Sequence, residues 1–123
     1  MTRKVRLTPA AEQDIADLLD RSADQFGDAG RDRYEHLLET ALRALAEGHP
    51  NGSRERPELG PGLFAYHLRH SRGRARQGGG RAVGRPRHFL IYRHPSHDLV
   101  LVLRVLYDAM DLARHVEDDP PGP

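Results

Sequence analysis

The stretch RPRHFLIYRHPSHDLVLVLRVLYDAMDLARHV, residues 85–116, decides the fold of this 123-residue chain. Its segments His88–Arg93 and Leu99–Leu106 are rich in valine, leucine, isoleucine and aromatic residues, which is typical of β-strands. Between them, HPSHD supplies proline, serine and aspartate for a turn. The stretch therefore predicts an antiparallel hairpin that runs into a polar, basic C-terminal segment.

The first half of the chain shows two helical patterns of apolar residues. Thr8 is suited to be an N-cap with Pro9 at the first helical position, and this pattern stops at Gly27. The second pattern begins near Ala29 and ends at Gly48. The two apolar stripes comprise Ile15, Leu18, Leu19, Ser22 and Phe26, and then Tyr34, Leu37, Leu38, Ala41, Leu42 and Leu45. We expect a helical hairpin that packs on a sheet.

The order of the elements predicts the fold class. Val5 and Leu7 lie in a short strand-like opening, and Leu63–Arg69 alternates like a strand. The order is therefore strand, helix, helix, strand, strand, strand, which predicts an α+β fold with the helical hairpin packed on a small, mainly antiparallel sheet. We expect one domain over residues 1–116 and a disordered tail over residues 117–123.

Composition excludes several kinds of site. The chain has no cysteine, so disulfides, cysteine metal sites and thiol nucleophiles are absent. HLRH and HPSH bring no cluster of carboxylates with them, and we expect neither a metal nor a cofactor. An apolar run of roughly 18 residues is lacking, and the start MTRKVRLTPAAEQD has no apolar core. We expect a soluble cytoplasmic protein that does not contact the membrane.

Positive charge is concentrated in one segment of a chain whose net charge is +1. Residues 69–88 carry seven arginines and no acid, while glycines interrupt the segment. We expect a flexible Arg/Gly-rich insert at about 71–86, neither helix nor strand. Its basic side chains are Arg72, Arg74, Arg76, Arg81 and Arg85. The insert either contacts nucleic acid or an acidic protein surface, or is a tolerated, solvated insertion.

The phrase RVLYDAMDLARHV resembles the end of the ParE/RelE superfamily of bacterial toxins, and more closely its ParE branch. LTPAAEQDIADLLDRSADQFG and DRYEHLLETALRALAEGHPNG resemble the two helices of that family, and FAYHLRH, RHFLIYR and DLVLVLRVL resemble its last three strands. The resemblance implies the toxin of a type II toxin–antitoxin system. It also implies a cognate antitoxin, a small DNA-binding protein with a disordered C-terminal segment, for which we expect apolar contacts at Leu38, Leu42 and Tyr66.

The two branches of the superfamily act differently. RelE-like members cleave mRNA in the ribosome with basic and aromatic residues, whereas ParE-like members are associated with poisoning DNA gyrase. Ala65 and His67 stand where RelE-like enzymes keep lysines, His88 where they keep an arginine, and Asp108 near where another is expected. These differences favour a non-catalytic gyrase inhibitor over an endoribonuclease.

Two alternatives remain open. His67, Arg69, His88, Arg104 and Tyr107 would suit metal-free ribonuclease chemistry, because histidine transfers protons near neutral pH. In this first alternative, the chain is a ribosome-dependent mRNA endoribonuclease. In the second alternative, it is a relative of the same fold that has lost toxicity.

Arg104 has two interpretations because it lies among apolar strand residues, where an unpaired guanidinium is costly to bury. Strand alternation places it on the same face as Val102 and Leu106. It forms either a structural ion pair, with Asp108 or Asp111, or part of a target-facing end. That end would comprise Arg104, Met110, Arg114 and His115.

Overall fold

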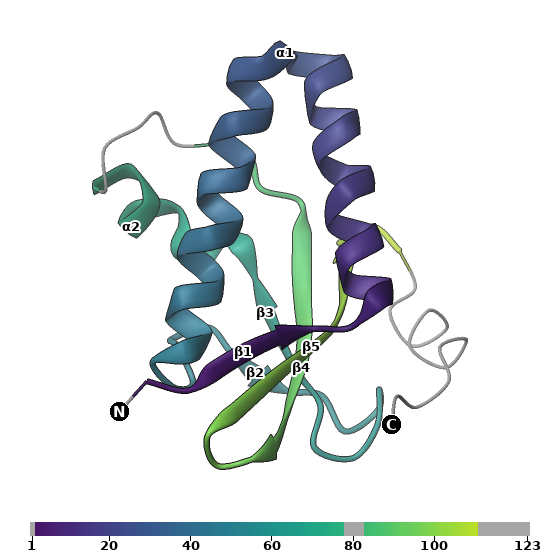
Figure 1. The fold of residues 1–123 in the computed structure, drawn as a ribbon, viewed down its shortest axis with the longest axis vertical. Helices are drawn as coiled ribbons and strands as arrows, with labels where there is room; N and C mark the ends of the chain where they lie inside the picture. The colour runs from purple at the N-terminus through teal and green to yellow at the C-terminus, as the bar shows by residue number, and fades with distance from the viewer. Residues whose placement is uncertain (1, 78–82, 111–123) are drawn as a thin grey trace.

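The computed structural model of the chain describes residues 2–77 and 83–110, and shows a helical hairpin on a five-stranded mixed sheet (Figure 1). The elements are β1 Lys4–Leu7, α1 Pro9–Ala46, β2 Arg54–Glu55, β3 Phe64–His67, the 3-10 turn η1 Leu68–Ser71, α2 Arg72–Gln77, β4 His88–Ser96 and β5 Leu99–Tyr107. The sheet order is β1-β5-β4-β3-β2, with β1 parallel to β5 and antiparallel pairing elsewhere. The predicted α+β fold is confirmed.

The helical hairpin is built from local signals. The Thr8 side chain accepts a hydrogen bond from the Ala11 N–H, and Pro9 occupies the first turn of α1. Gly27 has φ 75° and ψ −176°, a conformation that favours glycine and divides α1 into two arms. The arms lie side by side in Figure 1. The predicted hairpin and its turn at Gly27 are confirmed.

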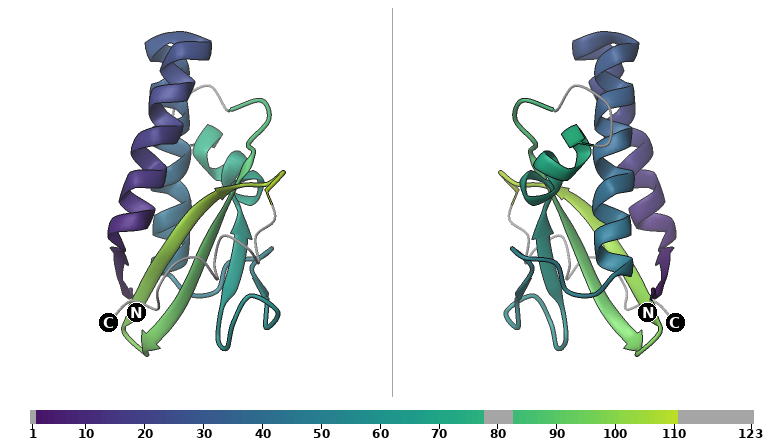
Figure 2. Two further views of the ribbon diagram at one scale, coloured as in Figure 1. Left: turned by 90° about the vertical axis from the view of Figure 1, so that its right-hand side faces the viewer. Right: turned by 90° about the vertical axis from the view of Figure 1, so that its left-hand side faces the viewer.

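The main core lies between the arms of α1 and one face of the sheet, as Figure 2 shows. Leu37 and Leu45 of the second arm are 1% and 0% exposed. Phe26 differs from its predicted place in the apolar stripe, because its side chain is 67% exposed. It directly precedes the turn at Gly27, and this tip of the hairpin extends past the sheet (Figure 2).

A smaller apolar cluster covers the other face of the sheet, with Leu59 and Leu63 packed on Ala65, Ile91 and Leu106. An irregularity in β5 determines which residues reach it. Ile91 pairs with Arg104, but the next residue, Tyr92, pairs with Val102. This β-bulge breaks the strand alternation, so that Val102 lies in the main core and Leu106 in the smaller cluster. The expectation that they share a face is wrong.

The basic segment is more ordered than the sequence indicates. Residues 68–77 form η1 and α2, which corrects the expected loop for Arg72–Gln77. Leu68, Ser71 and Ala75 recur at helical spacing and are buried, because this face packs against α1 and the sheet. Arg81 lies outside the described residues. No helix among residues 2–77 and 83–110 is long and apolar enough to span a membrane.

Candidate functional site at one end of the sheet

Three of the candidate ribonuclease residues meet where β3 ends, β4 begins and β5 ends. His88 pairs directly with Tyr107 across β4 and β5, and their rings lie 5.7 Å apart. His67 pairs with Phe89 in the neighbouring register position. The three residues therefore lie at one end of the sheet, but His67 shares a face with Phe89, whereas His88 and Tyr107 lie on the opposite face.

His67 is held in place at both ring nitrogens. Its Nδ1 accepts a hydrogen bond from the Arg69 N–H at 3.0 Å, and its Nε2 lies 3.0 Å from Asp108 Oδ2. Because the backbone N–H can only donate, Nε2 carries the proton and donates it to the carboxylate. The His67 side chain is 3% exposed. His67 is therefore a buried, hydrogen-bonded residue with no free nitrogen directed at solvent.

Asp108 joins His67 to Arg87. Arg87 Nε donates to Asp108 Oδ1 at 3.0 Å, and its guanidinium lies 5.1 Å from the centre of the Tyr107 ring. Burial raises the pKa of the Asp108 carboxyl, but hydrogen bonds from His67 and Arg87 outweigh burial and hold the pKa below its ordinary value. The carboxylate thus compensates the positive charge of Arg87.

His88 forms a second, neutral pair with Tyr34 of α1. The Tyr34 hydroxyl accepts from the Arg87 N–H at 3.1 Å and donates to His88 Nδ1 at 2.6 Å. Burial, followed by the charge of Arg21, lowers the pKa of His88 to about 4. Burial also raises the pKa of Tyr34 to about 12. Both side chains are therefore uncharged at neutral pH.

Arg104 is paired with Asp14 of α1. Arg104 Nε and Nη2 donate to the two Asp14 oxygens at 2.7 and 3.0 Å, and the Val105 N–H donates to the same carboxylate at 2.9 Å. An ion pair was one of the two expectations, but its partner lies on the helix. Asp108 is engaged by His67 and Arg87, and Asp111 lies outside the described residues. Asp14 was missed, although it lies three residues after the buried Ala11 and four before the buried Leu18, a spacing that places it on the same face of α1.

The remaining predicted site residues are dispersed. Arg69 is exposed on η1, and Met110 is 38% exposed after β5. Arg114 and His115 lie outside the described residues. Leu38 and Tyr66 are 3% and 2% exposed and belong to the core, so their contact with an antitoxin stays a prediction.

Leu42 is partly buried at the edge of the main core. The Tyr66 hydroxyl lies within hydrogen-bond distance of the Ser71 hydroxyl, at 2.7 Å.

Among the described residues, no three histidine, aspartate or glutamate side chains are arranged to hold a metal ion.

The fold places the chain in the class of small α+β proteins that have a helical hairpin on a ParE/RelE-type sheet. The family model of the ParE toxin of the type II toxin–antitoxin system, parDE, matches residues 5–112, so the chain belongs to that family. No curated protein matches the chain with significance. Membership supports a toxin that has a cognate antitoxin as partner.

Proposed function

We propose that this toxin inhibits growth by binding and poisoning DNA gyrase, without catalysing RNA cleavage. The observation that carries the proposal is that the candidate catalytic side chains His67, His88 and Arg104 are engaged by Asp108, Tyr34 and Asp14. A ribonuclease needs a positioned base and positive charge directed at the scissile phosphate. Here His67 and Arg87 converge on Asp108, and Arg104 converges on Asp14.

His88 does not replace the missing base. Its Nδ1 accepts the Tyr34 hydroxyl, and its pKa of about 4 lies far from neutral pH. General catalysis is most effective when the pKa lies near the working pH. The side chain is therefore a weak base, and it is not an acid at neutral pH. This supports a protein-binding toxin, which acts in the cytoplasm where gyrase is found.

The antitoxin is proposed to be a small DNA-binding protein whose disordered C-terminal segment folds over the toxin. Such a segment gains affinity by burying apolar side chains that the toxin leaves exposed. Phe26, Tyr107 and Met110 are large apolar residues with 67%, 37% and 38% exposure. Together with the partly buried Leu42, they are better candidates for this contact than the core residues Leu38 and Tyr66.

The test compares two activities of the full-length chain made by cell-free synthesis. We expect the chain to inhibit supercoiling of relaxed plasmid by gyrase and to leave ribosome-bound mRNA uncut. The Met110→Ala/Arg114→Ala/His115→Ala variant should lose inhibition with an unchanged melting temperature, because these residues form the proposed target-facing end. Lys4→Gln, at an exposed position of β1, serves as the control.

The opposite pair of results would contradict the proposal. Codon-positioned cleavage of mRNA with gyrase unaffected would assign the protein to the endoribonuclease alternative. Absence of both activities, in a chain that still binds its antitoxin, would assign it to the non-toxic relatives.

A further inference from the structure

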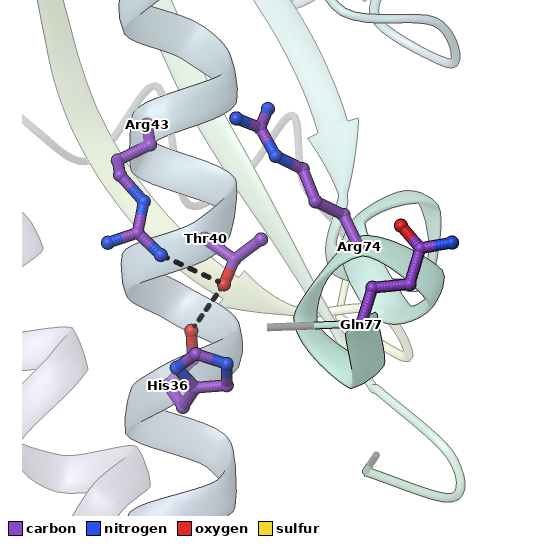
Figure 3. A pocket seen from close by; sticks show the side chains of 5 residues that line it. All are labelled: His36, Thr40, Arg43, Arg74 and Gln77. Atoms are coloured by element: carbon purple, nitrogen blue, oxygen red, sulfur yellow. Dashed lines mark hydrogen bonds between the residues drawn. The ribbon is translucent and has the colours of Figure 1, made fainter. Parts of the chain in front are cut away.

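A shallow depression of about 310 Å³ lies between the second arm of α1 and the short helix α2. Figure 3 shows its side chains extending from the two facing helices. The lining residues all carry hydrogen-bond donors: His36, Thr40, Arg43, Arg74 and Gln77. Two of the five are arginines, and none is an acid. The lining therefore has the chemistry of an anion site.

Contacts between the helices hold this surface in shape. His36 Nε2 donates to the Ala75 carbonyl at 3.0 Å and so fastens α2 to α1. Thr40 Oγ1 donates to the His36 carbonyl at 2.8 Å, and Arg43 reaches the same hydroxyl at 3.5 Å (Figure 3). These hydrogen bonds fix the Thr40 hydroxyl, and the Arg43 guanidinium lies beside it. One wall of the depression is therefore α1, and the other is the helical part of the basic segment.

Arg74 already holds a carboxylate in the geometry that a phosphate would use. Its Nη1 and Nη2 donate to the two Glu47 oxygens at 2.9 and 2.8 Å. Such a two-pronged contact suits phosphate as well as carboxylate. The ion pair lies in solvent, where exposed pairs contribute little to stability. An incoming phosphate can therefore replace Glu47 at small cost.

The positive charge continues beyond the depression. Arg72 and Arg76 are exposed and four residues apart, so they share one face of α2. Arg85, also exposed, follows in the chain, and residues 69–88 contain no acid. Arg72 and Arg76 lie two residues from Arg74 and so on the other side of α2, where they add to the local positive field. A positive field on several sides of a helix suits a ligand that carries many negative charges better than it suits a single acidic side chain.

We propose that the depression between α1 and α2, with the arginines of α2, binds phosphate groups of the DNA backbone. Arg43 and Arg74 bind non-bridging phosphate oxygens, and Gln77 adds a neutral donor. Contacts to phosphate position a protein on DNA without reading its sequence. The inference deepens the proposed gyrase function, since gyrase acts on DNA, and rests on that function for its biological setting alone.

The experiment measures binding of a short fluorescein-labelled DNA duplex to the full-length chain by fluorescence anisotropy. Wild-type affinity should fall steeply between about 50 and 200 mM salt, because binding releases counterions. Arg43→Gln/Arg74→Gln should weaken binding by about tenfold or more and reduce the slope of log affinity against log salt by about two. Lys4→Gln/Arg6→Gln removes the same charge from β1 and should retain wild-type affinity within about twofold.

Each other result overturns the site. Wild-type protein without affinity for DNA, or an equal loss in both double variants, leaves no role for the depression. Stronger binding to single-stranded RNA identifies a different nucleic acid. Displacement of the duplex by poly-glutamate at an equal concentration identifies an acidic protein surface instead.

The outcome is separable from that of the gyrase assay. DNA binding that is lost in Arg43→Gln/Arg74→Gln supports the site whether or not gyrase is inhibited. Gyrase inhibition by a chain without DNA affinity keeps the proposed function and overturns the site.

Discussion

At the scale of single residues, Asp14 connects the helical hairpin to the sheet. Its carboxylate accepts hydrogen bonds from Arg104 and from the Val105 N–H, next to the bulge of β5. A bulge disturbs the pairing of backbone groups, and an unpaired buried N–H is costly. The Asp14 carboxylate therefore accepts hydrogen bonds from a backbone N–H and from the guanidinium at the same time. The Asp14 and Arg104 side chains are 15% and 16% exposed, so water screens the contact weakly.

Breaking this contact should destabilise the protein. We expect Asp14→Ala and Arg104→Leu each to lower the free energy of unfolding by about 2–3 kcal/mol, because each leaves a poorly solvated partner group. Chemical denaturation of both variants and of the double variant measures the coupling between the two residues. Glu47→Gln breaks an exposed pair and serves as a control with little effect.

A different pattern would assign Arg104 to the target. If Arg104→Leu leaves the free energy of unfolding unchanged but abolishes gyrase inhibition, the Arg104 guanidinium contacts gyrase and is not needed for stability. A stability loss that apolar repacking restores would assign it to structure alone.

At the scale of elements, α2 is a small helix with a defined buried side. Ala75 is 4% exposed, and its carbonyl accepts from His36. Leu68, in the preceding turn η1, is fully buried in the main core. The basic arginines are therefore presented by a docked element, which is the condition for a depression of fixed shape.

We expect Ala75→Asp to lower the free energy of unfolding by roughly 2–3 kcal/mol, because it places a carboxylate on the buried side of α2. Arg76→Asp introduces the same side chain at an exposed position of the same helix and should change stability by less than about 0.5 kcal/mol. Thermal melting followed by circular dichroism compares them. Equal melting temperatures would mean that α2 does not pack on α1 in solution.

At the scale of the whole molecule, folding disfavours the charged form of several histidines. Burial lowers the pKa of His70, His88 and His94 below the ordinary value, and that of His88 to about 4. The unfolded chain protonates its histidines near pH 6.5. As pH falls from about 6.5 to about 4, the unfolded state thus gains protons at His88 that the folded state does not bind.

The free energy of unfolding should therefore decrease as the pH is lowered from about 6.5 to about 4, by roughly 3 kcal/mol from His88 alone. Below about pH 4, protonation of Asp108, whose pKa is lowered in the folded state, should continue the loss. Urea denaturation at a series of pH values measures the slope. His88→Asn retains an acceptor for the Tyr34 hydroxyl and should flatten it. Identical slopes in the two proteins would contradict the assignment to His88.

Local chemistry in the sequence determined the elements that depend on neighbouring residues. Thr8 and Pro9 begin α1, and Gly27 reverses it, because capping and positive φ are properties of a few adjacent residues. The hairpin of β4 and β5 likewise follows from two apolar runs around HPSHD. The order of these elements was sufficient to predict the α+β fold.

Tertiary structure alone decided which charged groups meet. Arg104 and Asp14 are 90 residues apart, and the bulge that brings the Val105 N–H to the same carboxylate leaves no signal in strand alternation. Arg87 and His67 meet at Asp108 only because β3 and β5 end where β4 begins. The helix α2 forms because Ala75 is covered by α1. Pairing and burial at such separations depend on the folded packing, so the sequence predicted the fold but not the state of its candidate site.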